Sequence, residues 1–162
     1  MVEVLTSERL QPVIAALECS SMKSLKYFLD LYKMYQDKFE EFGHDQTDGI
    51  IDLKHVNNNQ NVLHSVAKQD RQEGQAGCEA ASILKQYPDI VKCIANKADK
   101  YGTPPLLTAV RRNNIAVATL LVQNGSCFNQ NFKGPKTSPI NIAVTMGQDV
   151  ILKEMIQKMT GK

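Results

Sequence analysis

The chain of 162 residues has no tryptophan and only five tyrosines and five phenylalanines. Its apolar residues are mainly Leu, Ile, Val and Ala, a composition that favours packed helices over a β-sandwich. No run of eighteen apolar residues occurs, which argues against a membrane partner. The N-terminal stretch MVEVLTSERLQ lacks the basic start and apolar run of a secretory signal. We therefore expect one all-α domain over residues 1–162, located in the cytoplasm and/or the nucleus.

Patterns for metal binding and catalysis are missing as well. His44 and His55 have no second ligand at zinc spacing, and GQAG at 74–77 lacks the Lys-Ser/Thr of a phosphate loop. No CxxC pair occurs, so we expect the scattered cysteines to be small buried hydrophobic residues: Cys19, Cys78, Cys93 and Cys127. We expect no enzyme activity, no cofactor and no metal.

The formal net charge is only +2, but it is unevenly distributed. Residues 1–50 carry five Lys and Arg against nine Asp and Glu, whereas residues 51–162 carry fourteen against eight. This polarity would orient a charged protein partner. The basic excess is diffuse, whereas nucleic-acid binding favours a dense basic stripe. Nucleic-acid binding through the basic residues 99–162 remains the alternative function.

A seven-residue motif recurs along the chain. The segment PPLLTAV (104–110) reappears 34 residues later as SPINIAV and 43 residues earlier as NVLHSVA, with a degenerate copy, QPVIAAL, at 11–17. The first, third and fourth copies are each followed by a second apolar segment: SMKSLKYFLD, NIAVATLLVQNG and QDVILKEMIQKM. The pattern predicts stacked helical hairpins, because a single hairpin cannot bury its apolar face on both sides.

The residue types within each copy suit such a hairpin. Thr or Ser before Pro predicts an N-cap followed by Pro in the first turn, where the missing N–H costs nothing. Gly125 is expected to end the second helix of the third unit with a positive φ. The remaining apolar positions predict close packing between units: Ala109, Ala143, Val117, Leu120 and Leu121.

The stretch 101–129 resembles an ankyrin repeat. The matching residues are Gly102, Pro105, Leu106, Ala109, Val117, Leu120, Leu121, Gly125 and Asn129. Leu63-His64 supplies the Leu-His pair of this family in the second unit, and Ser138-Pro139 and Gly147 match in the fourth. The resemblance implies an all-α ankyrin solenoid of about four helix-turn-helix repeats, at about 8–48, 49–98, 99–131 and 132–162. It also implies that the His64 imidazole bonds to nearby backbone and fixes a turn.

The first two units depart from the family pattern. The second helix of unit one is expected to extend through LYKMYQDKFEEF before a polar loop. Unit two carries an insert at 68–77, rich in Gln, Gly and charge, which predicts a surface loop. Pro88 is expected to start a helical turn after a break.

The family resemblance implies that loop tips and the faces of the first helices bind a partner protein. On this chain the tips are Asp99, Lys100 and Tyr101 in unit three and Phe132, Lys133 and Lys136 in unit four. The helix face contributes Thr108, Arg111 and Arg112. Exposed aromatic side chains beside Lys and Arg are typical of binding hot spots, so we expect these to hold the partner: Lys100, Tyr101, Arg111, Arg112, Phe132 and Lys133. A second candidate is the acidic helix end with Asp37, Glu40 and Glu41 beside Phe39 and Phe42.

Two kinds of protein binder remain open. The size resembles that of free-standing ankyrin inhibitors. The segments LLTAV and SCFNQ are similar to sequence motifs common in the NF-κB inhibitors, which implies an IκB-like inhibitor of a transcription factor. The other possibility is a segment of a larger protein, acting as an adaptor or regulatory subunit of a kinase or another regulatory protein. This possibility is suggested by the last helix of this sequence, which lacks the strongly polar outer face that stacked repeats normally need at their ends.

Overall fold

The computed structural model describes residues 11–19, 21–41, 58–69, 76–131 and 137–161, and the elements in these ranges are all α-helices. This confirms the all-α class. In chain order the helices are α1 (Gln11–Glu18), α2 (Met22–Glu41), α3 (Val62–Lys68), α4 (Ala76–Leu84), α5 (Pro88–Ile94), α6 (Pro105–Arg111), α7 (Ile115–Gln123), α8 (Pro139–Thr145) and α9 (Asp149–Thr160).

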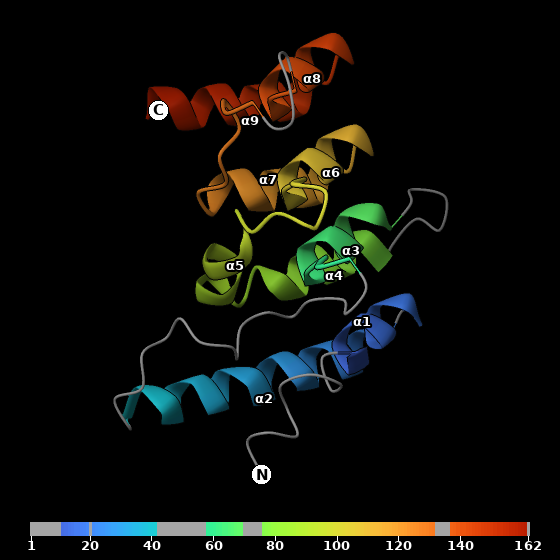
Figure 1. The fold of residues 1–162 in the computed structure, drawn as a ribbon, viewed down its shortest axis with the longest axis vertical. Helices are drawn as coiled ribbons and strands as arrows, with labels where there is room; N and C mark the ends of the chain where they lie inside the picture. The colour runs from blue at the N-terminus through green and yellow to red at the C-terminus, as the bar shows by residue number, and fades with distance from the viewer. Residues whose placement is uncertain (1–10, 20, 42–57, 70–75, 132–136, 162) are drawn as a thin grey trace.

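The helices pair into hairpins that lie one above another (Figure 1). The hairpins are α1 with α2, α3 with α4, α6 with α7, and α8 with α9. Between hairpins, α3 packs on α1, α6 on α3, and α8 on α6. A second layer forms in the same way, because α4 packs on α2, α7 on α4, and α9 on α7. The recurring motif therefore marks the first helix of each hairpin, as the sequence predicted.

The core between hairpins consists of the predicted small and branched residues. Ala109 and Ala143 are completely buried, which lets α6 and α8 approach closely. Val117, Leu120 and Leu121 are buried on α7, as their helical spacing predicted. Gly125 follows α7 with a φ of 87°, in the left-handed region that glycine enters without strain.

The capping prediction holds in one unit and is wrong in another. Ser138 is the N-cap of α8 and accepts a hydrogen bond from the Asn141 N–H at 3.3 Å, with Pro139 in the first turn. In α6 the N-cap is Pro104 and the first-turn proline is Pro105, so Thr103 lies outside the helix. Thr103 belongs instead to the preceding turn, because its carbonyl accepts a hydrogen bond from the Asp99 N–H at 3.0 Å and the residue before a proline disfavours the helical conformation.

The irregular units follow the predicted departures. Helix α2 continues to Glu41, and Pro88 begins α5 at its first turn. Tyr87, the residue before α5, is bonded to the first hairpin, because its hydroxyl donates a hydrogen bond to Asp30 Oδ1 of α2 at 2.5 Å. Burial, together with this bond to a carboxylate, raises the pKa of Tyr87 to about 12. Within the insert at 68–77, residues 70–75 lie outside the described part of the chain.

Side-chain amides tie each hairpin to the one before it. Gln69 Nε2 donates to the Leu17 carbonyl at 2.8 Å, and Asn114 Nδ2 donates to the Val66 carbonyl at 3.3 Å. Gln148 Nε2 repeats the bond at the next level, with the Val110 carbonyl at 2.7 Å. All three amides lie just after a first helix and reach a carbonyl near the end of the preceding first helix, where intrahelical donors run out.

The expectation that the cysteines are buried is wrong for three of them. Cys19, Cys93 and Cys127 are free thiols with exposed side chains. Cys93 lies in α5 between two buried neighbours on the other face of the helix, Val91 and Ile94. Composition cannot distinguish these two faces, because the register of a helix is set by what packs against it.

Candidate functional site

The segment 99–103, here called the tip loop, connects α5 to α6 and is held by the carboxylate of Asp99. Asp99 Oδ1 accepts hydrogen bonds from the backbone N–H groups of Tyr101 and Thr103, both at 2.9 Å. Asp99 Oδ2 accepts a bond from Gln60 Nε2 at 3.1 Å. The Lys100 N–H donates to the Asn58 carbonyl at 2.9 Å. The tip loop is therefore fixed both to itself and to the segment before α3.

Asp99 is only 8% exposed, so it is not part of the binding surface for which the sequence nominated it. Burial alone would raise the pKa of its carboxyl, but the hydrogen bonds from Thr103, Gln60 and Tyr101 outweigh that effect and lower the pKa. The carboxylate is thus kept ionised to organise backbone N–H groups. A sequence cannot separate this role from a surface contact, because both place an Asp in a polar loop.

His64, in the first turn of α3, also binds the tip loop. Its Nε2 donates to the Thr103 carbonyl at 2.8 Å, and its Nδ1 accepts from the Asn61 N–H at 3.1 Å. Burial lowers the pKa of His64, in agreement with this neutral tautomer. The prediction that the imidazole bonds to backbone and fixes a turn is confirmed.

Asn61 links the start of α3 to the end of α5. Its Oδ1 caps α3 by accepting from the N–H groups of Leu63 and His64, and its Nδ2 donates to the Ile94 carbonyl at 2.9 Å. The side chain is 1% exposed. No role for Asn61 was predicted from the sequence, although Asn before an apolar helical segment is a recognised N-cap signal.

Two of the predicted contact residues lie on this fixed loop. Tyr101 has 55% of its side chain exposed, and the Lys100 ammonium lies 5.1 Å from the centroid of its ring, in the range of a cation–π contact. The backbone at Gly102 has a φ of 70°, which lets the chain turn tightly after the aromatic residue.

The predicted arginines lie at the opposite end of α6. Arg111 is the last residue of the helix and Arg112 is its C-cap, and both side chains are exposed. At about 1.5 Å of rise per residue, roughly 10 Å of helix separates them from the end at which the tip loop enters. Thr108, which is half-buried, lies one turn before Arg112 on the same side of the helix. The structure thus presents two neighbouring groups rather than one cluster.

The other nominated residues cannot be placed. Phe132, Lys133 and Lys136 lie outside the described residues, as do Phe42, His44 and His55. The backbone of the acidic segment is helical to the end of α2, but the side chains of the remaining residues there are not described: Asp37, Phe39, Glu40 and Glu41. Their proposed roles stay predictions.

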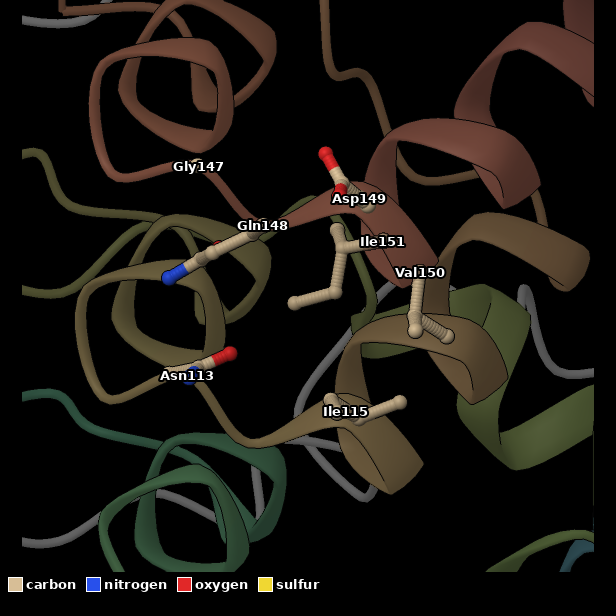
Figure 2. A pocket seen from close by; sticks show the side chains of 7 residues that line it. All are labelled: Asn113, Ile115, Gly147, Gln148, Asp149, Val150 and Ile151. Atoms are coloured by element: carbon tan, nitrogen blue, oxygen red, sulfur yellow. The ribbon is translucent and has the colours of Figure 1, made fainter.

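A pocket of about 250 Å³ lies between the third and fourth hairpins (Figure 2). It is bounded by the turn after α6 and the turn before α9, and its lining residues are Asn113, Ile115, Gly147, Gln148, Asp149, Val150 and Ile151. Asn113 and Gly147 stand 34 residues apart and share a positive φ, 52° and 64°. The pocket therefore arises where two equivalent turns stack.

The described part of the chain offers neither a metal-binding cluster nor a membrane-spanning helix. No group of three or more His, Cys, Asp or Glu residues is positioned to hold a metal ion among those residues. None of the helices described is long and apolar enough to cross a bilayer.

Comparison with known proteins adds no relative. A scan against protein-family models, a search of curated proteins and a search of solved structures each find no match to this chain.

Proposed function

We propose that this chain is an ankyrin-type repeat protein that acts as a non-enzymatic binding module for another protein, as an inhibitor or as an adaptor or regulatory subunit. The observation that carries the proposal is the exposed Tyr101 on a loop whose backbone is fixed by buried hydrogen bonds. The ordered stacking of the four hairpins and the Leu-His pair at 63–64 support the family assignment.

The rigidity of the tip loop bears directly on binding. A loop that is already ordered loses little conformational freedom when a partner binds, so a modest contact area can give useful affinity. Tyr and Arg are the side chains that most often dominate such contacts, because they combine large area with directional hydrogen bonds. Tyr101 and Arg112 are the two such residues that we expect the partner to cover.

The partner is proposed to be a regulatory protein, such as a kinase or a transcription factor. The test is affinity capture with the full chain, followed by measurement of the affinity for the captured protein. Tyr101→Ala combined with Arg112→Ala should weaken binding by at least about tenfold while leaving the melting temperature nearly unchanged. The matched control is Tyr27→Ala combined with Lys23→Ala on α2, where both side chains are exposed, and it should bind as the wild type does.

Salt dependence separates this function from nucleic-acid binding. A protein partner held by Tyr101 should keep much of its affinity in moderate salt, whereas nucleic-acid binding through Lys and Arg should fall steeply for any sequence. Recovery of nucleic acid instead of protein, or equal binding by the two double variants, would contradict the proposal.

A further inference from the structure

Helices α3 and α6 each leave one stripe of side chains outside the core. In both helices every residue is buried except the fourth and the seventh. These residues are Ser65 and Lys68 on α3 and Thr108 and Arg111 on α6. Residues three apart lie on the same side of a helix, so each pair forms one stripe. Since α6 packs on α3, the two stripes occupy equivalent positions at successive levels of the stack (Figure 1).

The Lys68 side chain connects the stripe on α3 to the tip loop. Its ammonium donates a hydrogen bond to Gln60 Oε1, and Gln60 Nε2 donates in turn to Asp99 Oδ2 at 3.1 Å. The backbone of Lys68 lies at the other end of α3, where Asn114 Nδ2 donates to the nearby carbonyl of Val66. The side chain therefore runs along the outside of α3, from its last turn towards the tip loop.

The tip loop and the end of α6 are thus joined into one surface, here called the basic face. Its cations are Lys68, Lys100, Arg111 and Arg112, and all four side chains are exposed. Lys68 was not among the contact residues predicted from the sequence. Among the described residues of this face the only carboxylate is that of Asp99, which is 8% exposed and already accepts three hydrogen bonds. The basic face therefore presents charge of one sign.

The other carboxylates whose side chains the structure describes lie on different helices. Asp30 is on α2, Glu79 on α4, Asp89 on α5, and Asp149 and Glu154 on α9. Helices α2, α5 and α9 also carry lysines, so their surfaces are mixed in charge. The separation of charge between these helices and the basic face follows the two layers of the stack, because α2, α4 and α9 belong to the second layer.

A surface with charge of one sign selects partners by complementarity. Guanidinium groups such as those of Arg111 and Arg112 bind a carboxylate through two parallel hydrogen bonds, and lysine ammonium groups add attraction without that directional requirement. Four cations over two levels of the stack fall short of the dense basic stripe that favours nucleic acid. The exposed ring of Tyr101 beside them adds the aromatic contact area that is typical of protein partners.

We propose that the basic face binds a segment of the partner protein that is rich in Asp and Glu. This inference rests on the proposed function and adds the chemistry of the partner to it. Carboxylates of the segment contact Lys68 and Arg111, and Tyr101 packs against the adjoining part of the segment. Complementary charge also orients the partner as it approaches and raises the association rate.

The experiment measures the affinity of the full chain for two fluorescein-labelled peptides by fluorescence anisotropy. One peptide alternates Glu with Ser, and the other has Gln in place of every Glu. The wild type should bind the Glu peptide and not the Gln peptide. Lys68→Gln combined with Arg111→Gln should raise the dissociation constant of the Glu peptide by at least about tenfold at low salt. The difference from the wild type should shrink at high salt, because exposed charges are then screened.

The matched control is Lys92→Gln combined with Lys153→Gln, at exposed residues of α5 and α9. It removes the same net charge and should bind the Glu peptide as the wild type does. Circular dichroism should show native helix content for both double variants. Equal weakening by the two double variants would mean that the peptide responds to net charge alone, and it would overturn the proposal. A wild type that does not bind the Glu peptide, or that binds single-stranded DNA more tightly, would overturn it as well.

The protein captured under the proposed function separates the two proposals. The Glu peptide should displace it, and the Lys68→Gln, Arg111→Gln variant should bind it more weakly. If its binding depends on Tyr101 and Arg112 but is unchanged in the Lys68→Gln, Arg111→Gln variant, the proposed function stands and the acidic segment is wrong. A captured protein whose binding does not depend on Tyr101 and Arg112 contradicts the proposed function instead.

Discussion

His64 Nε2 and the carbonyl oxygen of Thr103 lie 2.8 Å apart, although 39 positions separate the two residues in the chain. The bond joins the first turn of α3 to the loop that leads into α6. The buried imidazole also accepts a hydrogen bond from Asn61, so one side chain connects the N-terminus of its own helix to the next hairpin. The stack is therefore held by specific polar bonds between levels as well as by apolar packing.

Replacing His64 with Ala should lower the free energy of unfolding by about 2–3 kcal/mol, because it leaves the buried Asn61 N–H without its acceptor and creates a cavity. His64→Gln, which keeps volume and one donor, should cost less. Urea denaturation of the two variants checks the order, and equal losses would show that the hydrogen bonds are unimportant.

The same residue should make stability depend on pH. Burial lowers the pKa of His64 below its ordinary value of 6.5, so the unfolded chain binds the proton more readily than the folded protein does. The resulting stability is present above pH 6.5 and is lost as the pH falls through the lower folded pKa. Urea denaturation between pH 7 and pH 5 should show this decline, and His64→Gln should flatten it.

Asp99 provides a second stability prediction at the tip loop. Asp99→Ala should cost about 2 kcal/mol, since two N–H groups of the loop lose their acceptor. Asp99→Asn should cost about half as much, because its amide oxygen can still accept from Tyr101 and Thr103. Hydrogen exchange at the Tyr101 amide should rise strongly in the Ala variant, and protection unchanged from wild type would contradict the role of the carboxylate.

The ionisation of Asp99 should make the stability of the protein depend on pH in the acid range. Its pKa lies below the ordinary value of 3.8, so its contribution to stability is present above that pH and is lost as the pH falls through the folded pKa. Asp99→Asn removes the titrating group, so the variant should lose less stability between pH 4 and pH 2 than the wild type in the same urea experiment.

Tyr87 should affect stability in alkali. Its pKa is raised to about 12 by burial and by the bond to Asp30, so the folded protein retains the phenolic proton that the unfolded chain loses near pH 10. The contribution is present below pH 10 and is lost as the pH rises towards 12. Tyr87→Phe should cost about 1 kcal/mol at neutral pH, because Asp30 is exposed and loses only one partly solvated hydrogen bond.

The control for Tyr87 is Tyr27→Phe on α2, whose side chain is largely exposed. Thermal denaturation at pH 7 and pH 11 should separate the variants: only Tyr87→Phe should lower stability at the first pH and reduce the loss at the second. An identical response of both variants would refute the linkage to Asp30.

Gly147 tests the turn between α8 and α9. Its φ is 64°, and a Cβ atom built there meets nothing within 4 Å, so the effect of a side chain comes from the backbone conformation alone. Gly147→Ala should cost about 1 kcal/mol. Gly147→Asn should cost less, because Asn113 adopts the same conformation in the equivalent turn. If chemical denaturation shows a larger loss of stability for Gly147→Asn than for Gly147→Ala, this explanation is contradicted.

The hairpins were predictable because their signals are local. Each segment that follows PPLLTAV or SPINIAV shows the spacing of apolar positions typical of a helix by itself, and the recurrence of the motif after 34 residues adds the repeat. Gly125 and Ser138 were predictable for the same reason, since a left-handed residue and a cap act within one turn. The candidate loop tip with Asp99, Lys100 and Tyr101 came instead from the resemblance to ankyrin repeats.

The roles within that loop were not predictable. Asp99 was expected at the surface with Lys100 and Tyr101, yet its carboxylate is enclosed by backbone N–H groups and by Gln60 from 39 residues earlier. Gln148 was overlooked, although it continues the series of amide bonds begun by Gln69 and Asn114. The Gln60 amide that binds Asp99 precedes α3, and the carbonyl that Gln148 binds lies in α6, so no pattern within either segment identifies these partners.

The sequence by itself therefore determined the helical class, the hairpins and most of their ends, because hydrophobic spacing, prolines and glycines act over a few residues. Only the tertiary structure decided which polar residues are enclosed and which are exposed at the surface. It buried Asp99, left Tyr101 exposed, and covered Val110 while leaving the equivalent Val144 open. The physical reason is that burial depends on the neighbouring hairpin, so identical positions in a repeat differ when one has a further layer above it and the other does not.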